Sequence, residues 1–321
     1  SYNTAVGAFA GGNVTTGTDN NLIGGLAGDA LTTGSFNQVL GVAALSDDTQ
    51  GGRAVAIGHA ALGNQNFTTA TDNYNIAIGH NAGLSVTTGI RNNLIGGIAG
   101  DALTDGSNNI GLGFDALGTD TRGCRSVAIG SLALSAQNSS TLANMYNVAV
   151  GDNAGAAVTT GVENTLIGGN AGDALTDADF NVSVGTYALT SDTLGSKSTA
   201  IGASALNKQN FGTATDSHNT AVGFVAGKEV TTGRFNTFVG SLAGDALTAA
   251  DSNTAIGYVA LSSDTRGERA IAIGEGALFS QNFTTETNNY NVALGYNAGY
   301  SVTTAIQNTL IGGLAGDALT T

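Results

Sequence analysis

A short apolar segment followed by glycine recurs along the whole chain. The residue before this glycine is Val, Ile or Leu at all 18 positions, and the third residue after it is always Ala. The residue four places before the glycine is Asn at 14 of these 18 positions. An aliphatic residue beside a glycine is typical of a short strand that ends in a turn. The pattern therefore predicts one small structural unit repeated 18 times.

Successive glycines follow a spacing of 17, 17, 17 and 21, which then repeats and defines a 72-residue block. Four complete blocks cover residues 3–74, 75–146, 147–218 and 219–290, and a partial block covers 291–321. The Asn, aliphatic residue, Gly and Ala of the first unit in each complete block are Asn3, Val6, Gly7 and Ala10; Asn75, Ile78, Gly79 and Ala82; Asn147, Val150, Gly151 and Ala154; and Asn219, Val222, Gly223 and Ala226. We expect residues 1–321 to form a single continuous repeat domain.

The length of the unit decides the fold class. Seventeen residues are too few for a strand and a helix of useful length, and no apolar period of 3.6 residues is present. They suffice for short strands and turns, which can stack in parallel about 4.8 Å apart. We therefore predict an all-β protein, a parallel β-solenoid of about 18 coils, roughly 86 Å long at this spacing.

The repeated residues suggest how the interior is filled. We expect the aliphatic residue before each glycine to point inward, with the Ala as a second ladder and the Asn as a stacked amide ladder that bonds the coils above and below. The residue two places before the glycine, such as Ala5 or Ala77, is then expected to face outward. Because such a coil has a thin core, we predict that three alanine faces pack together in a homotrimer.

The fourth coil of each block has four extra residues, which form a loop. Insertions in a solenoid map to one edge, often the edge that binds a partner. The loops contain a repeated Gln-Asn pair, followed in three blocks by Phe, and three of them end in Tyr. The candidate recognition residues are Gln65, Asn66, Phe67, Tyr74, Gln137, Asn138, Tyr146, Gln209, Asn210, Phe211, Gln281, Asn282, Phe283 and Tyr290. The aromatic residues either stack on sugar rings of a surface glycan, or cover the edge of the solenoid or a groove of a neighbouring protomer.

Charged residues also follow the 72-residue period. Asp48 and Arg53 represent two such columns, and we expect them to pair across a turn. Carboxylates repeated in every block do not resemble an active site, which is normally singular, so we expect no enzyme activity. The three histidines share no position within the block, and Cys124 is the only cysteine, so we expect no metal site and no cofactor.

Composition narrows the range of partners. The chain has 24 acidic and 10 basic residues, and its formal net charge is −14. This balance disfavours nucleic acids and anionic membranes as partners. No apolar run approaches the ~18 residues that a membrane-spanning helix needs, so we expect no membrane insertion. The chain opens inside a repeat with Ser1, from which we expect an excerpt or a processed product.

Two segments carry a resemblance to known families. Residues 53–58 (RAVAIG) and 126–130 (SVAIG) resemble the repeats of YadA-type trimeric adhesin heads, which implies left-handed parallel β-rolls that trimerise. Residues 219–240, with their NTAVG, VTTG and NTFVG motifs, are more similar to arrays in phage tail fibres, notably cyanophage structural proteins and fibres ending in an endosialidase-type chaperone domain. The 17-residue coil, longer than the adhesin repeat, and the extended fourth coil depart from these families.

The resemblance implies a structural function. The expected protein is the rigid shaft of a phage tail fibre, located in the virion, which holds a host-binding tip away from the particle. One alternative is an adhesin head or extracellular filament on a bacterial surface, whose solenoid binds a glycan or protein receptor. A polysaccharide-degrading tailspike is a more distant alternative.

Overall fold

The structure is a computed structural model that describes residues 2–321. Over this range it contains 26 strands and no helix, and therefore no helix that could cross a membrane. The chain divides into two compact units, Ser1–Val162 and Glu163–Thr321. Their boundary falls inside the predicted block 147–218, and the continuity of the solenoid across this boundary stays a prediction.

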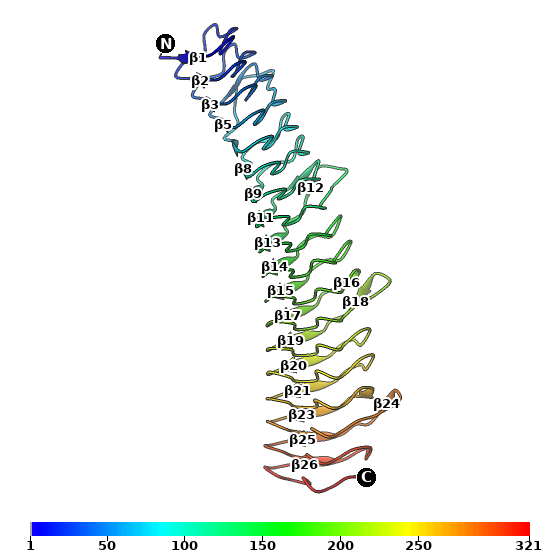
Figure 1. Cartoon of the computed structure of the whole chain (residues 1–321). Coiled ribbons are helices and arrows are strands. Elements are labelled where there is room, and N and C mark those ends of the chain that lie inside the picture. The colour runs from blue at the N-terminus through cyan, green and yellow to red at the C-terminus, as the bar shows by residue number, and fades with distance from the viewer. Residues whose placement is uncertain (1) are drawn as a thin grey trace. The chain divides into compact units, whose positions relative to one another are not determined.

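Each unit contains nine coils, and each coil contributes one three-residue strand to a parallel sheet. Figure 1 shows how these strands stack coil upon coil within each unit. The strands of the first unit are β1 (Thr4–Val6), β2 (Asn21–Ile23), β3 (Gln38–Leu40), β5 (Val55–Ile57), β7 (Ile76–Ile78), β8 (Asn93–Ile95), β9 (Ile110–Leu112), β11 (Val127–Ile129) and β13 (Val148–Val150). Those of the second unit are β14 (Thr165–Ile167), β15 (Val182–Val184), β17 (Thr199–Ile201), β19 (Thr220–Val222), β20 (Thr237–Val239), β21 (Thr254–Ile256), β23 (Ile271–Ile273), β25 (Val292–Leu294) and β26 (Thr309–Ile311). The predicted parallel β-solenoid of about 18 coils is confirmed.

The register between coils follows the sequence spacing. In each unit every strand pairs with the strand of the next coil, and equivalent residues lie opposite one another, as Thr4 does with Asn21. The extended coil keeps this register, because Val55 lies opposite Ile76, its counterpart beyond the longer loop. The four extra residues are therefore accommodated outside the sheet.

The extended coils add a second kind of strand. Each pairs a two-residue strand at the end of its loop with a two-residue strand of the preceding coil. In Figure 1 these loops protrude on the side away from the long strands. The pairs are β4 (Gly51–Gly52) with β6 (Thr71–Asp72), β10 (Gly123–Cys124) with β12 (Ala143–Asn144), β16 (Gly195–Ser196) with β18 (Thr215–Asp216), and β22 (Gly267–Glu268) with β24 (Thr287–Asn288).

The side chains of the long strands are oriented opposite to the prediction. Apart from the terminal strands β1 and β26, the middle residue of each three-residue strand is buried and its neighbours face outward. In β8, Leu94 is fully buried, whereas Ile95 before the corner glycine remains 39% exposed. The predicted inward ladder of Val6, Ile78, Val150 and Val222 and the predicted outward alanine face are therefore both wrong. In strands such as β7 the small residue lies in the narrow interior, whereas in β8 the interior accommodates Leu94.

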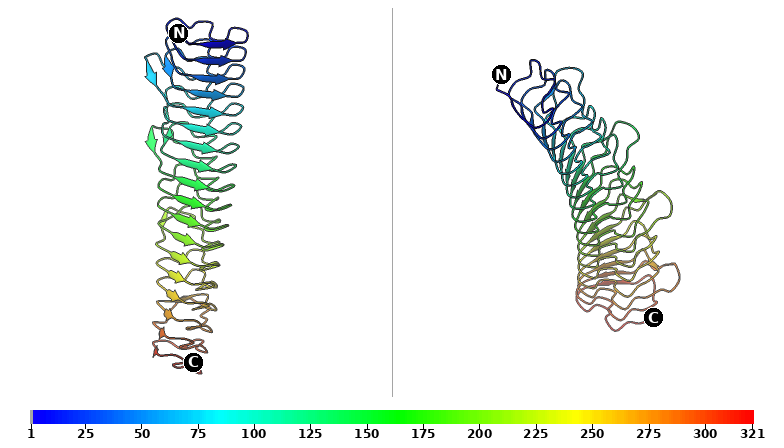
Figure 2. Two further views of the ribbon diagram at one scale, coloured as in Figure 1. Left: turned by 90° about the vertical axis from the view of Figure 1, so that its left-hand side faces the viewer. Right: turned by 45° about the horizontal axis from the view of Figure 1, so that its top comes forward.

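The outward residues before the corner glycines form a continuous row in each unit, which we call the aliphatic ladder. The sheets that carry it are seen face-on in the left view of Figure 2. Its residues are Val6, Ile23, Leu40, Ile57, Ile78, Ile95, Leu112, Ile129 and Val150 in the first unit, and Ile167, Val184, Ile201, Val222, Val239, Ile256, Ile273, Leu294 and Ile311 in the second.

The interior contains the predicted alanine and asparagine ladders. Ala82, Ala154 and Ala226 are fully buried, as is Asn37. The Asn37 Nδ2 donates to the Gly51 carbonyl at 3.0 Å, and its Oδ1 accepts from the Ala54 backbone N–H at 2.9 Å. The amide ladder is thus confirmed, although most of its bonds run from the side chain to the backbone, the Nδ2 bonding its own coil and the Oδ1 the next, rather than between side chains.

Candidate functional site

The extended loops hold most of the predicted recognition residues, but half of these are buried. Phe67, Phe211 and Phe283 are only 5–7% exposed. They therefore cover the edge of the solenoid, and the alternative in which they stack on a sugar ring is wrong. The four glutamines are also fully buried, whereas the asparagines that follow them are exposed: Gln65, Gln137, Gln209 and Gln281, and then Asn66, Asn138, Asn210 and Asn282.

A chain of buried hydrogen bonds explains the repeated glutamine. The Asn75 Nδ2 donates to the Gln65 Oε1 at 2.8 Å, and the Gln65 Nε2 donates to the Asp48 Oδ2 at 2.6 Å. The Asp48 Oδ1 accepts from the backbone N–H groups of Gly51 and Phe67. This arrangement ties the extended loop to the coil before it and the coil after it.

The same chain of bonds recurs in every complete block. Its members are Asp120, Gln137 and Asn147; Asp192, Gln209 and Asn219; and Asp264, Gln281 and Asn291. In the extended coil the asparagine ladder is interrupted by Ala54 and its equivalents, Ser126, Ser198 and Ala270. The glutamine amide supplies the acceptor for the next asparagine there. The loss of the ladder asparagine from the extended coil and the presence of glutamine in its loop therefore belong together, because the glutamine side chain replaces the asparagine as hydrogen-bond acceptor.

The predicted pairing of Asp48 with Arg53 is wrong. Asp48 is fully buried, and the Arg53 Nε instead contacts the Asp72 Oδ2 at 2.9 Å on the surface. The Arg53 guanidinium also lies 4.8 Å from the centre of the Phe36 ring and 5.8 Å from that of Tyr74. The ion pair is thus part of a surface stack at the base of the extended loop.

Burial changes the acidity of Asp48. It raises the pKa of the carboxyl group, and hydrogen bonds from Gln65, Phe67 and Gly51 oppose the rise without cancelling it. A carboxyl group with a raised pKa binds its proton more tightly in the folded chain. Its contribution to stability is complete below the ordinary pKa of 3.8 and is lost as the pH rises through the raised pKa.

The substitution Asp48→Asn removes this titration. We expect the free energy of unfolding of the natural chain, minus that of the variant, to fall as the pH rises above the ordinary pKa of 3.8. Urea unfolding at several pH values measures this difference. Asp47→Asn, which changes the exposed neighbouring carboxylate, serves as the matched control. A difference that rises with pH would contradict the raised pKa.

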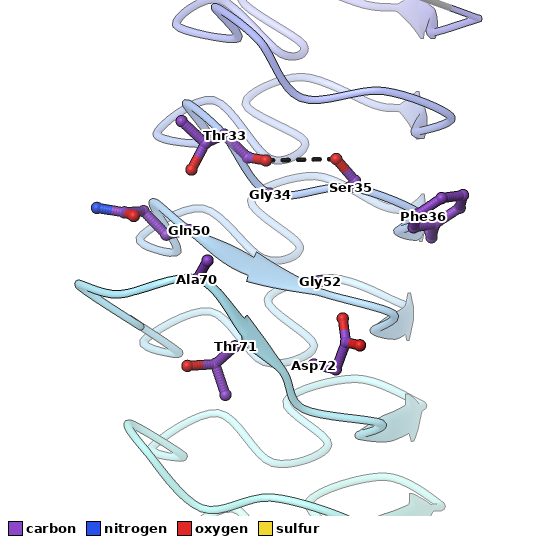
Figure 3. A pocket seen from close by; sticks show the side chains of 9 residues that line it. All are labelled: Thr33, Gly34, Ser35, Phe36, Gln50, Gly52, Ala70, Thr71 and Asp72. Carbon is purple, nitrogen blue, oxygen red and sulfur yellow. Dashed lines mark hydrogen bonds between the residues drawn. The ribbon is translucent and has the colours of Figure 1, made fainter.

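A groove lies beside each of the first three extended loops, over the paired short strands. Figure 3 shows it in the first block, where Phe36 and Asp72 lie at one end and Gln50 at the other. The Ser35 Oγ donates to the Thr33 carbonyl at 3.3 Å along its wall. The cavity volume is about 360 Å³ here, about 320 Å³ in the second block and about 700 Å³ in the third. The grooves thus repeat with the block, but their linings differ.

One surface column borders all of these grooves, and we call it the edge column. It consists of the residue five places before each corner glycine, and from Asp19 to Gln307 the backbone φ of this residue lies between +51° and +63°. Five of the ten basic residues of the chain belong to it: Arg53, Arg91, Arg125, Lys197 and Arg269. Over the same span it also contains six Phe and Tyr residues: Phe36, Tyr74, Tyr146, Phe180, Phe235 and Tyr290. Cations and aromatic rings of this acidic chain thus gather on one edge of each unit.

The predicted tyrosines lie in this column and are accessible. Tyr74, Tyr146 and Tyr290 are 46–50% exposed. The Arg125 guanidinium lies 5.8 Å from the centre of the Tyr146 ring, and the Arg269 Nη1 donates to the Tyr290 hydroxyl at 3.0 Å. Of the predicted recognition residues, the tyrosines and the exposed asparagines therefore remain available to a partner.

The sequence interpretation missed Phe36, Phe180 and Phe235 as surface aromatics. The available signal was their distance from the corner glycine, which is the same as that of Tyr74 and Arg53. Within the 72-residue block these phenylalanines occupy other positions than Tyr74 and Arg53. Within a single coil, however, all of these residues occupy the same position, five places before the corner glycine.

Metal-ligand candidates are few. No three His, Cys, Asp or Glu side chains come together to hold a metal ion in the part of the chain from Tyr2 onward. His59 and His80, expected to share no position, occupy equivalent sites in successive coils, and their rings stack 5.4 Å apart. Cys124 is buried, and its Sγ accepts from the Ser107 backbone N–H at 3.3 Å. Cys124 thus contributes to the wall of the second groove.

Comparison with known proteins assigns this chain to no family. No family model matches the sequence. No curated protein is significantly similar to it.

Proposed function

We propose that this chain is a shaft segment of a phage tail fibre, assembled as a homotrimer through the aliphatic ladder. The observation that carries the proposal is the ladder itself, in which all 18 outward positions are Val, Ile or Leu. Soluble chains rarely leave a contiguous apolar row exposed unless it meets a partner. The repeated coil and its resemblance to fibre arrays support a structural role for that assembly.

Burial of the ladder supplies a driving force that grows with length. Ile23, Ile95 and Ile167 are 38–40% exposed in the single chain. Covering this remaining area would contribute on the order of 1 kcal/mol per coil. Nine coils in a unit would then outweigh the cost of association, whereas one or two coils would not.

A second copy of the same chain is the partner that fits this surface. The ladder rises about 4.8 Å with each coil, and a partner must keep the same rise to remain in contact over nine coils. A second copy of the chain has the same rise per coil because it has the same structure, and its own ladder is equally apolar. The alanine faces from which we predicted the trimer lie inside the coil, so the aliphatic ladder replaces them in the proposed interface.

Light scattering tests the assembly. The purified chain is expected at three times its 31.6 kDa mass. The double substitution Ile78→Asp and Ile95→Asp places two charges at adjacent positions of the ladder. We expect this variant to be a folded monomer, because a trimer of it would bury six carboxylates. The control pair Thr68→Asp and Thr88→Asp adds the same charge at exposed turn positions and is expected to remain trimeric. A monomeric natural chain would contradict the proposal.

Immunogold electron microscopy of a culture that produces this chain tests the proposed role as a fibre shaft. Antibodies against this chain are expected to label the fibres of virus particles. Label on bacterial surfaces instead would favour the adhesin alternative.

A further inference from the structure

We propose that the groove of the second block binds an acidic saccharide through its carboxylate, with Arg125 as the cationic partner. This groove has a volume of about 320 Å³. Its lining consists of Ser107, Asn108, Cys124, Arg125, Leu142, Ala143 and Asn144. The proposal does not depend on the role of the chain as a fibre shaft.

The first block shows where a carboxylate would lie. There the Arg53 Nε contacts the Asp72 Oδ2 at 2.9 Å, so that the chain itself supplies the anion. In the second block the residue equivalent to Arg53 is Arg125, and the residue equivalent to Asp72 is Asn144. Arg125 forms no ion pair within residues 2–321. The charge of Asp72 is thus replaced by the neutral amide of Asn144, and the Arg125 charge remains uncompensated and available to an external carboxylate.

In the third block the equivalent cation is paired, whereas the fourth block resembles the second. In the third block Lys197 pairs with Asp216, and Asp177 and Asp179 also line the groove. In the fourth block Asn288 replaces the partner carboxylate, as Asn144 does in the second.

Acidic residues nevertheless surround the fourth site. Burial and the charges of Asp251 and Glu286 raise the pKa of Glu268, the neighbour of Arg269. The residues equivalent to Asp251, Glu268 and Glu286 in the second block are Ser107, Cys124 and Leu142, none of which has a carboxyl group. The second block therefore combines a free guanidinium with a neutral wall, and an anion is repelled least there.

A nearby ion pair leaves the charge of the second groove positive. Arg122 donates to both carboxylate oxygens of Asp105, with its Nε at 2.9 Å and its Nη2 at 2.6 Å. This bidentate pair compensates the charge of the nearby Asp105 carboxylate and holds its pKa below the ordinary value. Arg125 thus retains a net charge for a ligand.

The remaining groups favour a sugar over a simple anion. The Tyr146 ring is 46% exposed and lies beside Arg125, where the apolar face of a pyranose can stack on it. The amide groups of Asn108 and Asn144 are exposed and can both donate and accept hydrogen bonds with hydroxyl groups. A hexuronic or sialic acid carries the carboxylate, the ring face and the hydroxyls together.

Saturation-transfer NMR on the full chain tests the inference with glucuronate, N-acetylneuraminate, glucose and acetate. We expect transfer to either acidic sugar and little to glucose or acetate. Arg125→Gln is expected to weaken binding of the acidic sugar about tenfold, the effect of losing one charge-assisted contact. Equal signals for glucose, or acetate binding as tightly as the acidic sugars, would overturn the proposal.

Exchange of one residue between blocks provides the sharpest control. Asn144→Asp places the internal carboxylate of the first block beside Arg125 and is expected to weaken binding about tenfold without unfolding the chain. Asp72→Asn removes that carboxylate from Arg53 and is expected to add a second binding site in the first block. Circular dichroism checks that both variants fold. Unchanged binding in folded Asn144→Asp would contradict the assignment of Arg125.

Discussion

Gly168→Ala is expected to destabilise its unit by on the order of 3 kcal/mol or more. Gly168 is a corner glycine with φ at +133°, a conformation that residues with a side chain rarely adopt. A Cβ atom there would lie 2.7 Å from the Gly185 carbonyl of the next coil. Neither backbone can move away without breaking the pairing of β14 with β15. Urea unfolding followed by circular dichroism measures the loss.

The next residue provides a matched control. A Cβ atom on Gly169 would meet nothing within 4 Å, and its φ lies outside the left-handed region. Gly169→Ala is therefore expected to change the free energy of unfolding by less than about 0.5 kcal/mol. Similar effects of the two substitutions would show that the coils are not stacked as closely as described here.

Gln65→Ala is expected to cost roughly 3 kcal/mol of unfolding free energy. The substitution removes the donor to the Asp48 Oδ2 and the acceptor of the Asn75 Nδ2, both of which are buried. The Asp48 carboxylate would then keep only its bonds from backbone N–H groups, among them those of Gly51 and Phe67 to its other oxygen. An unpaired buried carboxylate oxygen is costly because no water replaces the lost donor. The midpoint of urea unfolding measures this cost.

Asn66→Ala is the matched control, one residue along the same loop. Asn66 is exposed, and its Oδ1 accepts only from the Thr49 hydroxyl, at 3.2 Å. We expect a change of about 0.5 kcal/mol. If Asn66→Ala were the more damaging substitution, the buried chain of hydrogen bonds would not be what holds the extended loop.

The buried chain also explains why the block, and not the single coil, is the repeating unit. Asp48 lies in the third coil, Gln65 in the fourth and Asn75 in the first coil of the next block. The direction of donation is fixed, since Asn75 donates to Gln65 and Gln65 donates to Asp48. A carboxylate, which only accepts, is required at its end. A change in any one of these coils therefore requires a change in its neighbours.

The sequence alone determined the number of coils, their register and their parallel stacking. The spacing of its corner glycines repeats without insertion or deletion between blocks, so each strand can pair only with its equivalent. It also identified the asparagine ladder and the position of the extended loops. These features depend on period and length, which a sequence displays directly.

Only the tertiary structure decided which side of each strand faces inward. The last two residues of a strand such as β7, Ala77 and Ile78, are both apolar, so the alternation of polarity does not distinguish them. A signal was present in Asn75, which lies two residues before Ala77 and therefore on its side of the strand. In most coils the interior takes a small residue because adjacent walls of the coil are close together, and it takes a larger one such as Leu94 where Gly83 and Gly100 leave room.

The surface site also depended on the tertiary structure. Phe36, Arg53 and Asp72 are well separated in the sequence, yet one stack contains all three. Their proximity results from the loop returning to pair β6 with β4, which the sequence spacing alone does not require. The contrast between Asp72 and Asn144, on which the proposed saccharide site depends, has a chemical meaning only once Arg53 is seen beside Asp72.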